Sequence, residues 1–189
     1  MEDIKLAKKE LRNAMKSRLA AVSPEEAEKA SRLVLEKLES LEQWKSSEVV
    51  LAFVSMKDEL GTAQVIRKAL MQGKTVAVPR VTGSDLVFCR IEDIEKDTVP
   101  GAFGILEPVS GLPEVDIKTL SDCHSVVLVP GLAFDKENFR LGRGKGFYDR
   151  FLASAGDSVY KIGIGYSFQL VERVPKENHD LRLDLLIVV

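Results

Sequence analysis

Six short, mostly apolar runs limit this chain to a narrow class of folds. They occupy residues 48–55, 75–81, 85–91, 124–130, 160–166 and 184–189. A strand is apolar along its whole length when both of its faces are buried, which is typical of parallel sheets covered by helices. The runs therefore predict an α/β fold with three layers, α/β/α, around a mostly parallel, mixed sheet of the Rossmann-like kind.

The intervening segments carry apolar residues at helical spacing, and helices are predicted over residues 3–22, 24–41, 62–73 and 146–155. The second helix has a capping signal, because Ser23 precedes Pro24 and Glu26 can close a capping box. Lysines and an arginine recur on one face of the first helix, which is either a solvated face or a face directed at an anion. The segment 92–116 is rich in proline, glycine and acidic residues, so we expect a long surface loop there. With no internal repeat or clear boundary, residues 1–189 are expected to form a single domain.

The charge balance argues against a general affinity for nucleic acids or membranes. The chain has 27 basic and 29 acidic residues and a net charge of -2, so any anion site has to be built locally. No apolar stretch reaches the roughly 20 residues that span a bilayer, and the first 20 residues lack the apolar centre of a signal peptide. We therefore expect a cytoplasmic protein without nucleic-acid or membrane partners.

Positive charge is nevertheless concentrated in the glycine-rich segment RLGRGKGFYDR, residues 140–150. It follows an apolar run and precedes a predicted helix, and in an open parallel sheet ligands bind where such loops leave the strands. Glycines let backbone N–H groups approach an anion, and the helix N-terminus adds its dipole. The spacing fits neither the Walker A loop nor the GxGxxG dinucleotide fingerprint. A phosphate or nucleotide site, an RNA backbone contact and a purely structural turn all remain open from the residues alone.

The longer string PGLAFDKENFRLGRGKGFYDRFL, residues 130–152, resembles the signature of the 5-formyltetrahydrofolate cyclo-ligases, also called methenyltetrahydrofolate synthetases. Other pieces that resemble this family follow in the family's order: KKELR (8–12), SMKDELGT (55–62), VAVPRV (76–81), FGILEP (103–108) and VPKENHDLRLD (174–184). The resemblance covers almost the whole chain and implies one α/β domain. The family usually has glycine at the position of Asn138.

The resemblance implies an ATP- and Mg²⁺-dependent enzyme that converts 5-formyltetrahydrofolate to 5,10-methenyltetrahydrofolate, releasing ADP and phosphate through a phosphorylated formyl intermediate. Its partners would be these small molecules, and we expect a monomer. Two alternatives are kept: a sugar-phosphate or acyl-CoA enzyme on a similar scaffold, and an RNA-binding module that uses the basic first helix and the arginines of the loop.

The matching positions imply a set of site residues. The catalytic residues would be Lys145 and Arg143. The ATP-binding residues would be Lys8, Lys9, Glu10, Leu11, Arg12, Arg140, Leu141, Gly142, Arg143, Gly144, Lys145, Gly146, Phe147 and Tyr148. The folate-binding residues would be Val54, Met56, Glu59, Phe103, Arg143, Gly144, Lys145, Gly146 and Phe147, with Glu59 accepting hydrogen bonds from the pterin. Asp149 and Asp180 resemble the family's Mg²⁺ ligands.

Overall fold

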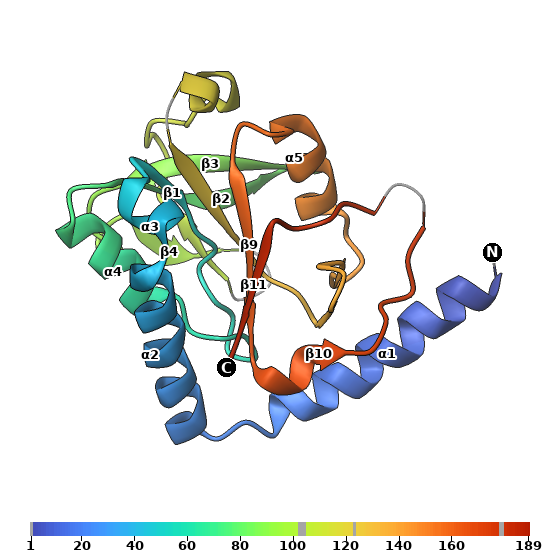
Figure 1. Ribbon diagram of the computed structural model, residues 1–189. Coiled ribbons are helices and arrows are strands. Elements are labelled where there is room, and N and C mark those ends of the chain that lie inside the picture. Colours follow the sequence, from blue (N-terminus) through green and yellow to red (C-terminus); the bar gives the residue numbers. More distant parts are fainter. Residues whose placement is uncertain (1, 102–104, 123, 178–179) are drawn as a thin grey trace.

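The computed structural model describes residues 2–101, 105–122, 124–177 and 180–189. At its centre is a six-stranded sheet with the strand order β11-β9-β6-β1-β2-β3 (Figure 1). The strands are β1 (Val49–Leu51), β2 (Thr75–Thr82), β3 (Asp85–Ile91), β6 (Ser125–Val129), β9 (Tyr160–Gly165) and β11 (Leu185–Val188). Neighbouring strands are parallel except β3, which pairs antiparallel with β2. The predicted mixed, mostly parallel sheet is confirmed.

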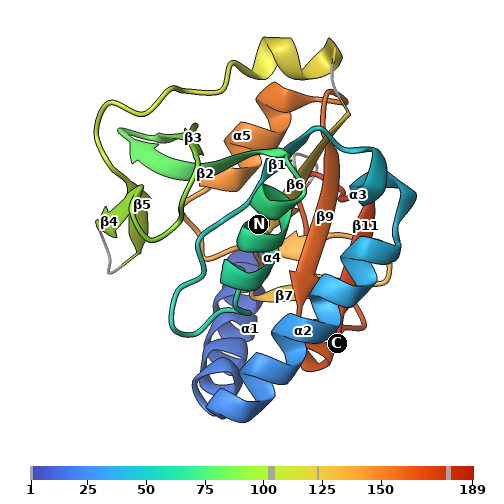
Figure 2. The same ribbon diagram turned by 90° about the vertical axis from the view of Figure 1, so that its left-hand side faces the viewer.

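Helices cover both faces of this sheet, as the apolar runs predict. The helices α2 (Pro24–Ser40) and α4 (Ala63–Met71) lie on one face, and α5 (Phe147–Ala155) with the 3-10 helix η2 (Ile117–Asp122) lies on the other (Figures 1 and 2). Successive residues of β1 alternate between the two cores: Val50 packs with the α2 side, and Val49 and Leu51 pack with the α5 side. The three-layer α/β/α arrangement is therefore confirmed.

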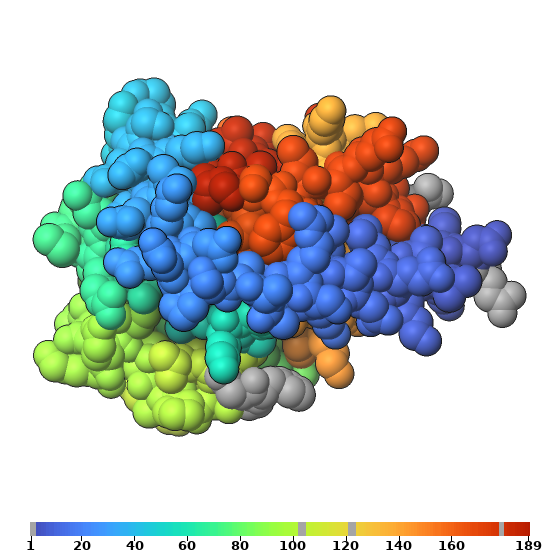
Figure 3. Space-filling view, turned by 90° about the horizontal axis from the view of Figure 1, so that it is seen from below, coloured from blue at the N-terminus to red at the C-terminus, as the bar shows by residue number. Residues whose placement is uncertain are grey.

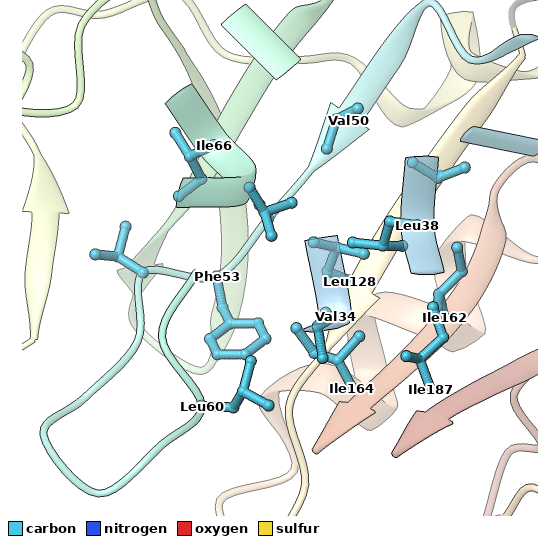
Figure 4. Close-up of a cluster of buried hydrophobic side chains, with 14 of the residues drawn as sticks. Val34, Leu38, Val50, Phe53, Leu60, Ile66, Leu128, Ile162, Ile164 and Ile187 are labelled. Carbon is cyan, nitrogen blue, oxygen red and sulfur yellow. The ribbon is translucent and has the colours of Figure 1, made fainter. Parts of the chain in front are cut away.

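The helix α2 begins where the sequence predicts. Ser23 is the N-cap, its hydroxyl accepts from the Glu26 N–H at 3.2 Å, and the Glu26 carboxylate accepts from the Ser23 N–H at 2.9 Å. On the buried face of α2, Val34 and Leu38 pack against Leu128 of β6 and residues of β9 (Figure 4). A short helix, α3 (Glu42–Ser46), follows α2 and buries Trp44.

Two expectations about individual segments are wrong. The segment 92–116 contains an antiparallel hairpin, β4 (Thr98–Pro100) with β5 (Leu106–Pro108), instead of being a loop throughout. Each strand is only three residues long and ends in proline, so its alternation is too short to stand out in the sequence. The run 48–55 gives a strand only over Val49–Leu51, and the chain then leaves the ladder.

The order of the strands opens a crevice at the centre of the sheet. The strands β1 and β6 are parallel neighbours. After β1 the chain turns to one side, through α4 to β2, whereas after β6 it continues to β9 on the other side. Loops that leave adjacent strands in opposite directions leave room for a ligand at the carboxyl ends of those strands.

The first helix, α1 (Glu2–Ala20), lies along the end of the sheet where the parallel strands finish (Figures 1 and 3). Met15 and Leu19 are buried, and Arg18 lies over the Phe168 ring at 4.7 Å. Its neighbours come from a second, three-stranded sheet, β7 (Ala133–Asp135), β8 (Arg140–Leu141) and β10 (Leu170–Val171), and from the 3-10 helix η3 (Ser167–Gln169). Figure 3 shows α1, in blue, beside the orange and red C-terminal part of the chain.

Replacing Leu38 by alanine should lower the free energy of unfolding by about 2–5 kcal/mol, because a fully buried side chain leaves a cavity between α2 and the sheet. Leu33→Ala is the matched control on the same helix, because Leu33 is 36% exposed and should cost less than about 1 kcal/mol. Urea denaturation measures both. Equal losses of unfolding free energy would mean that the buried face of α2 contributes no more to stability than its exposed face.

Candidate active site

A cavity of about 350 Å³ opens at the carboxyl ends of β1, β2 and β6. Four separate parts of the chain line it: the segment after β1, the β2–β3 hairpin, the β4–β5 hairpin, and the stretch from Pro130 to Asp149. Its lining residues are Phe53, Val54, Met56, Glu59, Pro79, Val81, Leu86, Ile105, Glu107, Pro130, Gly131, Arg140 and 142–149. The crevice predicted by the strand order is therefore a real cavity, and the glycine-rich segment forms one of its walls.

The glycine-rich segment leads from β8 directly into the N-terminus of α5. Gly144 and Gly146 have φ angles of 98° and 71°, a left-handed conformation that glycine adopts without strain. Gly146 is the N-cap of α5, and no side chain of the described residues caps this end. Phe147, Tyr148 and Asp149, in the first turn, also line the cavity. The uncapped helix terminus is therefore suited to an anion held in the cavity.

Arg140 lies at the base of this wall, and its side chain is only 5% exposed. Its guanidinium donates to the Asp149 carboxylate at 2.6 Å and lies 5.6 Å from the centre of the Tyr148 ring. Burial lowers the pKa of Arg140, and the negative charges of Asp149 and Asp180 oppose that shift. A buried cation held by one half-exposed carboxylate leaves this part of the cavity able to attract a further anion.

Arg143 connects the glycine-rich segment to the segment after β1. Its Nε donates to Glu59 Oε1 at 3.2 Å, and its Nη2 donates to Asp58 Oδ1 at 2.8 Å. The other oxygen of Glu59 accepts the Met56 N–H at 3.0 Å. One arginine therefore joins two walls of the cavity that are 84 residues apart in the sequence.

Glu59 lines the cavity with a side chain that is 13% exposed, compared with 43% for Asp149. Burial raises the pKa of Glu59, and the Met56 N–H and the charge of Arg143 partly oppose this effect. An ionised carboxylate in an apolar wall is costly unless it is paired, so such a group marks a place where donors are expected to bind.

Tyr148 is partly exposed as a residue, but its hydroxyl is buried. Among the described residues, its hydroxyl is the one buried side-chain N or O atom without a hydrogen-bond partner. Burial and the nearby charge of Glu59 raise the pKa of Tyr148, so the hydroxyl keeps its proton. Buried hydroxyls normally find a partner, and this one lines the cavity, so a bound molecule is its natural partner.

A sequence model described as the 5-formyltetrahydrofolate cyclo-ligase family matches residues 4–189. This chain belongs to that family. A curated relative, the 5-formyltetrahydrofolate cyclo-ligase of Mus musculus, is 31% identical over 187 residues, which cover 94% of this chain and 91% of the relative. The probable 5-formyltetrahydrofolate cyclo-ligase of Caenorhabditis elegans is 32% identical and covers 99% of this chain and 95% of its own length.

Solved structures agree with this family assignment. The NMR structure of the 5,10-methenyltetrahydrofolate synthetase of Aquifex aeolicus superposes with a TM-score of 0.81, at 35% identity, over 96% of this chain and 89% of that chain. A 5,10-methenyltetrahydrofolate synthetase from Mycoplasma pneumoniae gives a TM-score of 0.74 at 23% identity, over 95% of this chain and 97% of that chain, and shares the fold. The predicted family and fold are both confirmed.

Most of the residues that the family resemblance selects from the middle of the chain come together in the cavity. Its lining includes Val54, Met56, Glu59, Arg140 and every residue from Gly142 to Asp149. Leu141 is 2% exposed and packs in the core, so it could offer only its backbone to a ligand. Phe103 lies outside the described residues.

The candidates on α1 lie beside the cavity instead of lining it. Arg12 Nε donates to the Gly142 carbonyl at 3.0 Å, so α1 supports the glycine-rich segment directly. Lys8 Nζ pairs with Glu177 at 3.1 Å and with Asp180 at 2.8 Å. Lys9 and Glu10 are exposed, and Leu11 packs against the core.

Sequence reasoning missed the rest of the apolar wall and one charged partner. Pro79 and Val81 are two residues apart on β2 and point to the same side, which the strand alternation could have indicated. Leu86, Ile105 and Pro130 also line the cavity. Ile105 and Pro130 lie within segments that resemble the family but are not among the predicted site residues, and no pattern in the sequence sets Leu86 apart. Asp58, which forms an ion pair with Arg143, is next to Glu59 in the sequence, but nothing in the sequence distinguishes it from an ordinary surface acid.

Replacing Tyr148 by phenylalanine should leave the free energy of unfolding of the ligand-free protein unchanged within about 1 kcal/mol, or raise it, because the buried hydroxyl has no partner to lose. Thr62→Val is the control, since the Thr62 hydroxyl is buried, donates to the Phe53 carbonyl at 2.6 Å and accepts the Ser55 N–H. Its loss should cost about 1–3 kcal/mol. Thermal or urea unfolding compares the two, and equal losses would contradict the assignment of an unpaired hydroxyl.

Proposed function

We propose that this chain is a 5-formyltetrahydrofolate cyclo-ligase, which uses ATP and Mg²⁺ to close 5-formyltetrahydrofolate to 5,10-methenyltetrahydrofolate. The proposal rests on the family membership and on one observation, that the cavity has two chemically different parts. One part of the lining holds the Glu59 carboxylate, which is 13% exposed, among apolar side chains, and another part is the cationic, glycine-rich segment that leads into α5. A flat, nitrogen-rich ring suits the first part, and phosphates suit the second.

The folate ring would bind at the Glu59 wall. A 2-amino pyrimidinone edge presents two parallel N–H donors, and a carboxylate can accept both. Phe53, Val54, Met56 and Leu86 provide the apolar surroundings that a pterin ring needs. The positive charge of Arg143 favours the ionised form of Glu59, which is the form that accepts both hydrogen bonds.

The triphosphate would bind at the glycine-rich wall. The backbone N–H groups at the uncapped start of α5 would donate hydrogen bonds to the phosphate oxygens. Arg140, Arg143 and Lys145 line the same part of the cavity and would add positive charge. Phosphoryl transfer needs mainly positioning and neutralisation of charge, which these groups can supply. The support that Arg12 gives to Gly142 would hold the segment in place.

In the proposed reaction the formyl oxygen attacks the γ-phosphorus of ATP, an O–P bond forms, and the bond to the β-phosphate oxygen breaks to release ADP. The formyl oxygen is then part of a phosphate ester on an iminium carbon. N10 attacks this carbon and loses its proton, and the C–O bond breaks to release phosphate. Charge accumulates on the transferred group, next to Arg143 and Lys145 in this arrangement.

The two candidate metal ligands fit Mg²⁺ only together with phosphate. Asp149 has a side chain that is 43% exposed and lines the cavity, and the charges of Asp149 and Asp180 both act on Arg140. Within the described residues, no group of three or more His, Cys, Asp or Glu could hold a metal ion. Mg²⁺ commonly takes one or two carboxylates and completes its shell with phosphate oxygens and water. When bound, it would neutralise phosphate charge, with Asp149 and Asp180 as its protein ligands.

The direct test follows the absorbance of the methenyl product from 5-formyltetrahydrofolate, with ATP and Mg²⁺ each added or left out. Product is expected only when both are present. Product without ATP, or no product in the complete mixture, would overturn the proposal. A sugar-phosphate enzyme or an RNA-binding module would form no product under any of these conditions.

Three broader expectations accompany this proposal: one domain, a monomer, and a cytoplasmic location. In the part of the chain that the structure describes, no helix combines the length and apolar character needed to cross a membrane. The domain, the oligomeric state and the location remain predictions.

Replacing Glu59 by glutamine should weaken binding of 5-formyltetrahydrofolate by about 10- to 100-fold, because a hydrogen bond to a charged group is lost. Binding of ATP, measured by calorimetry in parallel, should change little. Equal losses for both ligands would contradict a role of Glu59 in holding the pterin.

The same variant makes a prediction about stability and pH. Since the folded-state pKa of Glu59 is raised, its charged form is disfavoured by folding, and its contribution to stability decreases as the pH rises from 4.5 through the folded-state pKa. Ligand-free Glu59→Gln should therefore be at least as stable as the wild type at pH 7. The difference should disappear below pH 4.5. Melting curves at several pH values measure it.

Replacing Lys145 by alanine should reduce kcat more than it raises the KM for ATP, because the charge on the transferred group is greater in the transition state than in bound ATP. Lys145→Arg keeps the charge but changes its geometry and serves as the control. A variant with normal kcat and a raised KM would make Lys145 an anchor for ATP only. A fall in melting temperature without a kinetic effect would make the segment a structural turn.

A further inference from the structure

We propose that Asp58 is a positioning residue for this reaction and that it acts through Arg143. The inference rests on the proposed function, since it assumes that Arg143 serves the phosphoryl group and that Glu59 serves the pterin. Asp58 itself does not line the cavity, so its effect has to pass through the guanidinium that it holds.

The contacts of Arg143 show how this can work. A guanidinium has five N–H donors, and Arg143 uses its Nε for Glu59 and its Nη2 for Asp58. Its Nη1 has no hydrogen-bond partner among the described residues. Because Arg143 lines the cavity, this remaining edge of the guanidinium is available to a ligand, while the other two nitrogens fix its plane.

The two carboxylates do not hold Arg143 equally. The contact with Asp58 is 2.8 Å, within the range of a charge-assisted hydrogen bond, and the contact with Glu59 is 3.2 Å. The closer partner is therefore the one that the pterin does not need. This division leaves the more buried carboxylate, Glu59, only loosely engaged by the arginine.

The loss of Asp58 would change how Arg143 is shared between the two carboxylates. Without its nearer partner, the guanidinium would be attracted to Glu59 alone, and the favoured geometry of an arginine–carboxylate pair is two parallel hydrogen bonds. Arg143 would then cover the carboxylate that the pterin uses and would turn away from the phosphoryl group. A displacement of about 1 Å at such a group is enough to cost on the order of 100-fold in rate.

The experiment compares Asp58→Asn with two matched variants. Asp85→Asn is the control, because Asp85 pairs with Arg150 at 3.4 Å, is 65% exposed and contacts neither Arg143 nor Glu59 among the interactions of the described residues. Asp58→Glu restores the charge on a longer side chain. Steady-state kinetics, calorimetric titration with 5-formyltetrahydrofolate in the absence of ATP, and melting curves are recorded for each.

Asp58→Asn is expected to lower kcat by about tenfold or more and to weaken folate binding without ATP, with a change in melting temperature below about 4 °C. Asp58→Glu should recover part of both losses, and Asp85→Asn should behave as the wild type. Wild-type values for Asp58→Asn, while the wild-type protein makes product, would overturn the role of Asp58 and leave the proposed function intact. So would a large loss of stability that Asp58→Glu does not reverse. A wild-type protein that forms no product would overturn the proposed function itself.

Discussion

The position of the cavity depends on one constraint, the burial of β1 and β6 side by side. These two strands are paired with each other and with β2 and β9, and every one of their residues is buried. A strand enclosed in this way can present only its carboxyl end to a ligand. Since the chain leaves the two ends in opposite directions, the cavity, the carboxylate wall and the cationic wall all meet at this one point.

The charges in the cavity and beside it are largely balanced within the protein itself. Arg140 pairs with Asp149, Arg143 with Asp58 and Glu59, and Lys8 with Glu177 and Asp180. Arrangements of this kind keep buried cations charged and fixed before a ligand arrives, so little reorganisation is needed afterwards. An incoming phosphate has to compete with carboxylates for these cations, which favours ligands that bring a compensating metal ion of their own.

The sheet and its helices could be predicted from the sequence because the signals are local: apolar runs, helical spacing and the Ser23–Glu26 capping box. The glycine-rich wall could also be predicted, and even the departure at Asn138 has a physical explanation, since its φ is 66°, a conformation that asparagine tolerates better than most residues. Part of the apolar wall, such as Leu86, and the contact between Asp58 and Arg143 could not be predicted. They depend on which segments the fold brings together, and no neighbouring residue reveals it.

The position of α1 has a consequence for the order in which the protein can be completed during synthesis. This helix is made well before its partners Gly142, Phe168, Glu177 and Asp180, which lie at least 130 residues further along the chain than the α1 residues that contact them. Most of the stability of a helix in a protein comes from packing of its apolar face, and α1 lacks that packing until these partners are present. On a translating ribosome, α1 therefore has to wait, exposed and only partly helical, until most of the chain has emerged. Docking of α1 onto these later segments is then one late event, and the support that Arg12 gives to the glycine-rich segment is established only at that stage.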